Sequence, residues 1–136
     1  MTMNKRYKRA ALPIMAGLMA LGTSATNVSA QEQYSFLFSD HSVGRTVSRL
    51  ISPLEVTLEI ERAGLRISGN DRSEICAVFR NLTSNEWSGG YRLTDRDENN
   101  THASLRIPGF GSVRRCETLN PQMRYYLVLR RHGSGV

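Results

Sequence analysis

Residues 54–61 read LEVTLEIE and alternate apolar and polar side chains without a break. Successive side chains of a β-strand point to opposite faces, so this order gives a strand one apolar face and one polar face. A helix would spread the same apolar residues around its whole axis. The segment is therefore predicted to be a strand, and the fold must place a core against one side of it.

The same alternation recurs along the chain, with turn-forming residues about every ten positions. Residues 73–82 are apolar on both faces, which predicts a central strand. Residues 42–51 fit helical spacing and are predicted to be a short helix or an irregular crossover. Residues 62–64 are predicted to connect a hairpin, and Gly89-Gly90 indicate a bulge or a close backbone approach. The remaining predicted strands are 34–39, 65–68, 86–94, 101–107, 113–118 and 123–131.

Seven or eight short strands separated by turns are typical of a β-sandwich or a small barrel. A chain of 136 residues is long enough for one domain. The sequence therefore predicts an all-β fold, a small antiparallel β-sandwich formed by residues 31–136. The order Cys76, Trp87, Cys116, with the tryptophan about a dozen residues after the first cysteine, favours an immunoglobulin-like topology.

The first 30 residues have the three parts of a secretory signal. Residues 1–9 are cationic, residues 10–22 are apolar, and Val28 and Ala30 stand at the −3 and −1 positions of a cleavage site. The apolar run is shorter than the roughly 20 residues that span a bilayer. We therefore expect cleavage before Gln31, no membrane span afterwards, and a product located in the periplasm, at the cell surface or outside the cell.

The net charge of +6 comes mostly from that leader. The leader holds four of the 18 basic residues and no acidic one, which leaves 14 basic against 12 acidic residues, all 14 being arginine. A charge near +2 on the remaining domain is no basis for predicting nucleic-acid binding.

The two cysteines, Cys76 and Cys116, both lie after the leader. An even number of cysteines in an oxidising compartment indicates a disulfide bond. Neither a C-x-x-C spacing nor a nearby histidine points to a redox pair or a metal site. The sequence therefore predicts one structural disulfide.

Two sets of residues are candidate binding sites. The aromatic side chains Tyr34, Phe36 and Phe38 alternate on the first predicted strand, which could add to the sheet of another subunit and form an oligomer through edge strands. Arginines are frequent in the last third of the chain. If the last two strands pair, some of them share a face that suits an acidic protein or an anionic surface glycan; the alternative is a solvated strand face. These arginines are Arg114, Arg115, Arg124, Arg130 and Arg131.

The sequence contains no motif for a known catalytic centre or cofactor. Residues 95–99 begin like a calcium-binding loop, but Asn100 and Arg106 stand where that loop needs glycine and glutamate. No histidine has metal-ligand spacing to another ligand. We therefore expect no metal and no cofactor.

These observations predict an exported, non-enzymatic binding or assembly module, of the kind that adhesins and pilus subunits represent. One alternative is a secreted inhibitor of a protease or lysozyme, with residues 95–100 or 108–111 as its inhibitory loop. Another is a small secreted hydrolase or toxin that uses His41 or His102 together with an arginine.

Overall fold

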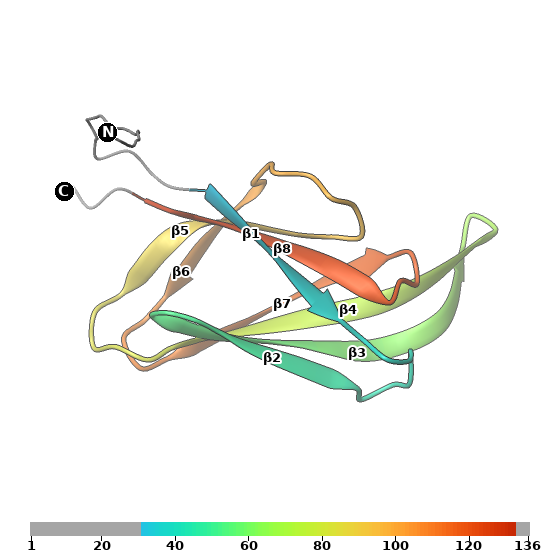
Figure 1. The fold of residues 1–136 in the computed structure, drawn as a ribbon, viewed down its shortest axis with the longest axis horizontal. Helices are drawn as coiled ribbons and strands as arrows, with labels where there is room; N and C mark the ends of the chain where they lie inside the picture. Colours follow the sequence, from blue (N-terminus) through green and yellow to red (C-terminus); the bar gives the residue numbers. More distant parts are fainter. Residues whose placement is uncertain (1–30, 133–136) are drawn as a thin grey trace, which may run out of the picture. The chain divides into compact units, whose positions relative to one another are not determined.

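The computed structural model describes residues 31–132, which form eight β-strands and no helix (Figure 1). The all-β prediction is confirmed for this part of the chain. The predicted leader, residues 1–30, lies outside the described residues. No described helix could cross a membrane. The strands are β1 (Gln31–Leu37), β2 (Thr46–Ile51), β3 (Leu54–Ile67), β4 (Asn70–Asn81), β5 (Trp87–Thr94), β6 (Ala103–Ile107), β7 (Ser112–Leu119) and β8 (Arg124–Arg131).

The strands form two antiparallel sheets of four. Sheet I has the order β1-β8-β5-β6, and sheet II has the order β2-β3-β4-β7. The chain passes from one sheet to the other after β1, β4, β6 and β7. Strands that pair within a sheet, such as β1 and β8, are therefore often far apart in the sequence. The central position predicted for residues 73–82 is confirmed, because β4 pairs with both β3 and β7.

One hydrophobic core joins the inner faces of the two sheets. Leu54, Val56, Leu58 and Ile60 of β3 are all at most 1% exposed, as their alternation predicts. Side chains from sheet I, with Tyr125 of β8 among them, belong to the same buried cluster. Burial of each such side chain contributes roughly 1.5–3 kcal/mol.

The helical prediction for residues 42–51 is wrong, because Thr46–Ile51 form edge strand β2 on β3. Val43 and Leu50 are exposed, so the apolar residues of this segment do not form one buried helical stripe. Val47 and Ile51 instead pack against the core at strand spacing. The β preference of threonine, valine and isoleucine prevails here.

The hairpin predicted at residues 62–64 is also wrong, because β3 continues to Ile67. Register shifts between Ile60 and Arg62, and between Arg62 and Leu65, take up these residues as an irregularity in the ladder with β4. The chain reverses at Ser68 and Gly69 instead. Both have positive φ, 52° and 79°, which suits a two-residue hairpin loop.

Candidate functional site

The five arginines predicted as a binding surface are not brought together. β7 pairs with β4 in sheet II, whereas β8 pairs with β1 and β5 in sheet I. Arg114 lies on the outer face of sheet II, where its guanidinium is 2.5 Å from Glu61 Oε1. Arg124 and Arg130 alternate with core residues of β8 and therefore lie on the outer face of sheet I. The face shared by the last two strands, on which the prediction depended, does not exist.

The aromatic residues of the first predicted strand, residues 34–39, belong to the protein's own core. Phe36 and Phe38 are buried, and Tyr34 packs against the same cluster. β1 pairs with β8 along its whole length, so strand addition would have to use its outer edge. Arg49 of β2 covers part of that edge: it donates a 3.0 Å hydrogen bond to the Ser35 carbonyl, and its guanidinium lies 5.9 Å from the Tyr34 and Phe36 ring centroids. An inward-pointing charge of this kind discourages pairing with another chain.

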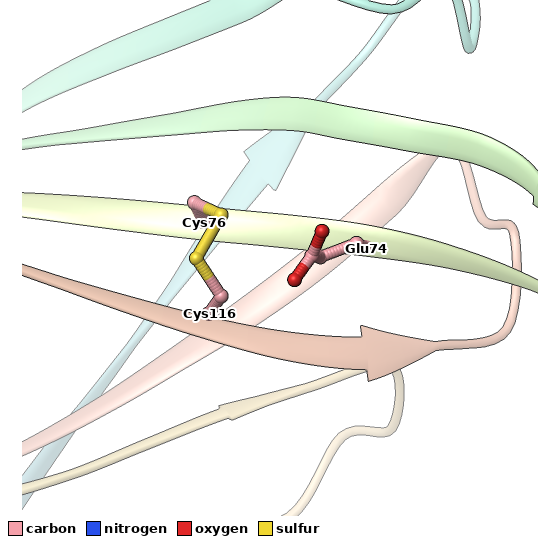
Figure 2. Close-up of side chains that lie close together, drawn as sticks. All are labelled: Glu74, Cys76 and Cys116. Carbon is pink, nitrogen blue, oxygen red and sulfur yellow. A yellow bond between two sulfur atoms is a disulfide. The ribbon is translucent and has the colours of Figure 1, made fainter.

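The predicted disulfide between Cys76 and Cys116 is present, and it links neighbouring strands of one sheet (Figure 2). The bond lies on the outer face of sheet II, because the adjacent Ile75 and Ala77 point into the core. Trp87 is on β5 in the other sheet. The disulfide therefore does not join the two sheets beside a tryptophan, as it does in immunoglobulin domains.

Glu74 lies beside the disulfide, and its carboxylate oxygen is within 4.8 Å of both sulfur atoms (Figure 2). The two sulfur atoms are bonded to each other and are not free thiolates. The Glu74 carboxylate accepts a 2.8 Å hydrogen bond from Arg62 Nε. The cluster therefore offers a metal no thiolate ligand while the disulfide is intact.

The loop at residues 95–102 holds its acidic side chains apart. Asp95 accepts a 2.8 Å hydrogen bond from the Asn120 backbone, and Asp97 accepts one of 2.5 Å from Gln33 Nε2. Each carboxylate thus fixes the loop to a different strand or connection. The calcium-loop interpretation gains no support from this arrangement.

A polar cleft of about 430 Å³ contains His102. Tyr91 also lines it, and burial together with the nearby Glu117 carboxylate raises the pKa of the Tyr91 hydroxyl. The His102 ring forms no hydrogen bond with any residue between 31 and 132, so no partner orients it as a general base. The cleft offers room and charge for a small polar molecule. Its lining residues come from β4 to β7 and the loops beside them: Arg72, Tyr91, Arg92, Leu93, Thr94, Asp95, Arg96, His102, Ala103, Glu117, Leu119 and Asn120.

The other predicted histidine, His41, has a structural environment. Its Nε2 contacts the Gln122 carbonyl oxygen and lies 3.3 Å from the Tyr125 hydroxyl. Its ring also packs against the Tyr125 ring, at a centroid distance of 5.7 Å. These contacts tie the β1–β2 connection to the chain segment before β8.

A second, more apolar cleft of about 290 Å³ lies beside the β2–β3 turn, and we call it the Trp87 cleft. Burial, and then a hydrogen bond to the Glu32 carboxylate, raise the pKa of the Tyr34 hydroxyl at its rim to about 12. The residues that line it are Glu32, Tyr34, Ile51, Ser52, Pro53, Leu54, Trp87, Leu129 and Arg131.

Three connections meet at the end of the molecule that we call the Phe110 end: residues 52–53, 82–86 and 108–111 (Figure 1, left). The Leu82 amide donates to the Pro53 carbonyl at 3.0 Å, and the Phe110 amide donates to the Thr83 carbonyl at 2.7 Å. Buried Asn81 donates to Asn85 O at 2.7 Å and accepts from the Thr83 amide at 3.0 Å. Hydrogen bonds thus fix all three connections to one another.

Phe110 is the most prominent side chain of this end. It is 72% exposed and has a φ of 55°, in the left-handed region that bulky residues rarely adopt. Its turn is closed by a 2.9 Å hydrogen bond from Gly111 N–H to Pro108 O. The turn packs so closely on the β4–β5 loop that a Cβ on Gly109 would lie 2.1 Å from the Ser84 carbonyl oxygen. The phenyl ring is therefore presented to solvent by an anchored loop.

The residues Pro-Gly-Phe-Gly at 108–111 predict a turn, and this turn is one of the two candidate inhibitory loops. The sequence pattern alone does not distinguish Phe110 from the other residues of the turn. The sequence does contain a signal for the exposure of Phe110: it lies between two glycines in a turn, and glycines have no side chains that could cover its ring.

No protein-family model, curated protein or solved structure matches this chain. The geometry of the described residues is therefore the basis for assigning a function.

Proposed function

We propose that this protein is an exported, non-enzymatic protein-binding module of the periplasm or cell surface, which holds its partner through the Phe110 end. The observation that carries the proposal is the exposed phenylalanine on an anchored turn. Aromatic anchors that enter a pocket of the partner provide much of the affinity of protein interfaces.

The energetics favour binding over solvation for this side chain. Burying a phenylalanine contributes about 1.5–3 kcal/mol. A non-glycine residue in the left-handed region costs on the order of 1–3 kcal/mol, and such conformations are concentrated at functional sites. Because the loop is already held in one conformation, little further ordering is needed when a partner binds.

The proposal includes a β-sandwich architecture, but not the immunoglobulin-like topology, because the last two strands lie in different sheets and the disulfide lies within one sheet. This architecture is supported by the two four-stranded antiparallel sheets, which share one core. The chain passes from one sheet to the other four times, as is common in β-sandwiches. Loops at the end of such a sandwich are common binding sites, since the sheets hold them rigidly. The leader-like residues 1–30 and the disulfide are the grounds for proposing export.

A secreted inhibitor would use the same loop, and it is the second candidate. Proteases generally bind extended peptide segments. The turn at residues 108–111 is closed by its own hydrogen bond, so an inhibitor of this kind would plug a pocket with Phe110 instead of lying in the cleft like a substrate. The identity of the bound partner distinguishes the two functions.

Site-specific photo-crosslinking tests the proposal. The full chain is produced with p-benzoylphenylalanine in place of Phe110 and, as a matched control, in place of Ile67, which is 47% exposed at the opposite end of β3. After irradiation in the extracytoplasmic fraction of the source cells, we expect one discrete adduct from position 110 and none from position 67.

Competition makes the result specific. Unlabelled wild-type protein and the Ile67→Ala variant should suppress the adduct equally, while Phe110→Ala should do so at least about tenfold less well. Equal competition by Phe110→Ala, or the absence of an adduct at position 110, would rule out the Phe110 end as the binding surface.

A further inference from the structure

The Phe110 end carries a recess of its own as well as the exposed ring. The Trp87 cleft shares Pro53 and Trp87 with an adjoining depression that also includes Thr83, the residue that binds the Phe110 amide. The turn that carries Phe110 and the Trp87 cleft therefore lie at the same end of the molecule. Phe110 is largely solvent-exposed, so it does not occupy the cleft of its own chain.

The cleft suits an aromatic ring. The Trp87 cleft is an open recess of about 290 Å³, which is enough volume for a phenyl ring. Ile51 and the exposed edges of Trp87 and Leu129, which are 5% and 6% exposed, provide apolar contacts, and aromatic pairs add roughly 0.5–1.5 kcal/mol beyond burial. The remaining volume accommodates the Gly-flanked turn that carries the ring.

The charges around this end are balanced. Glu32 and Arg131 stand on the cleft, while Arg106 lies 3.7 Å from Glu86 as an exposed ion pair. Two acidic and two basic groups give no net charge that would repel a second copy. Under a two-fold axis, groups of opposite sign on the same surface can face each other across the interface.

We propose that the partner at the Phe110 end is a second copy of this chain, and that each copy inserts Phe110 into the Trp87 cleft of the other. This inference depends on the proposed function, which it narrows to self-association. Because the ring and the cleft lie on the same end, a two-fold axis satisfies both at once and closes the assembly as a dimer.

Sedimentation equilibrium of the purified wild-type protein, from micromolar to millimolar concentrations, measures the association. We expect a monomer–dimer equilibrium that Phe110→Ala weakens about tenfold or more and that Phe110→Asp abolishes. Ile67→Asp adds the same charge at the far end of β3 and should leave the equilibrium unchanged. The fluorescence of Trp87, the only tryptophan, verifies that each variant is folded.

Cross-linking between labelled copies locates the contact independently of these variants. A chain with p-benzoylphenylalanine in place of Phe110 is mixed with a ¹⁵N-labelled wild-type chain, irradiated and digested. Adducts to labelled peptides that contain residues 51–54 or 87 are expected.

Three results would overturn the inference: a wild-type monomer at every concentration, a dimer that persists in Phe110→Asp, or adducts that map elsewhere. The wild type could also be a monomer while Phe110→Ala competes less well than wild type for the photo-crosslinked adduct. That pair of results would rule out the dimer and would still support the proposed function.

Discussion

Removing the disulfide should destabilise the protein strongly and should affect β7 first. β7 is an edge strand with no fully buried residue, and two of its inward positions carry Arg115 and Glu117. It therefore gains little from the hydrophobic core. Its attachment depends on the ladder with β4 and on the Cys76–Cys116 bond in the middle of that ladder.

The magnitude follows from the length of the closed loop. The two cysteines are 40 residues apart, for which the chain-entropy relation assigns about 4 kcal/mol at 25 °C. Small domains have total stabilities of about 5–15 kcal/mol. Loss of the bond should therefore remove a quarter or more of the free energy of unfolding.

The assay is urea denaturation of wild type and of the double variant Cys76→Ala/Cys116→Ala, followed by the fluorescence of buried Trp87. Wild type reduced by a dithiol serves as the control and should match the variant. Amide exchange should become fast throughout β7 while β3 stays protected. A loss of stability below about 1 kcal/mol, or β7 amides that stay as protected as those of β3, would show that the disulfide does not hold β7 in place.

Three further predictions test the packing, the ionisation and the edge of the fold. Gly89→Ala would place a Cβ 2.1 Å from the Arg130 carbonyl oxygen and should lower the urea midpoint by more than an exposed alanine substitution does. The Tyr34 pKa of about 12 lies above the unfolded value of 10, so its contribution to stability is complete below pH 10 and is lost as pH rises toward 12; Tyr34→Phe should reduce this loss in denaturation curves measured across that range. Arg49→Ala uncovers the Ser35 carbonyl on the edge of β1 and should shorten the lag of thioflavin-detected aggregation; an unchanged lag would show that Arg49 does not protect this edge.

The strands that could be predicted from the sequence are those with one buried and one solvated face. β3 alternates because it has the core on one side and solvent on the other; β8 also has the core on one side, and Val128 on its outer face is buried as well. β2 cannot be recognised from alternation, because an edge strand buries few residues. The exposed Leu50 interrupts the alternation, and the apolar residues of this segment then fit helical spacing. The close approach expected at Gly89 is present, since the Arg130 backbone passes beside it.

The arrangement of strands depends on contacts that local patterns do not encode. The arginine surface required β7 to pair with β8, because those strands are adjacent in sequence. They belong to different sheets, since the chain crosses over after β7. The crossing after β6 brings β7 into sheet II, where Cys116 lies beside Cys76 on the neighbouring strand and not where the spacing in immunoglobulin domains would place it.

Phe110 shows most clearly where local sequence preference and the fold disagree. The i+2 position of its turn favours glycine, and a glycine lies on either side of it, yet the position with φ of 55° holds a phenylalanine. The ring is exposed, so packing within the chain does not repay the strained backbone. Local conflicts that the fold itself does not resolve are expected at functional sites. A partner that buries the ring would supply the missing compensation, which is why the binding proposal centres on this residue and not on the more numerous arginines.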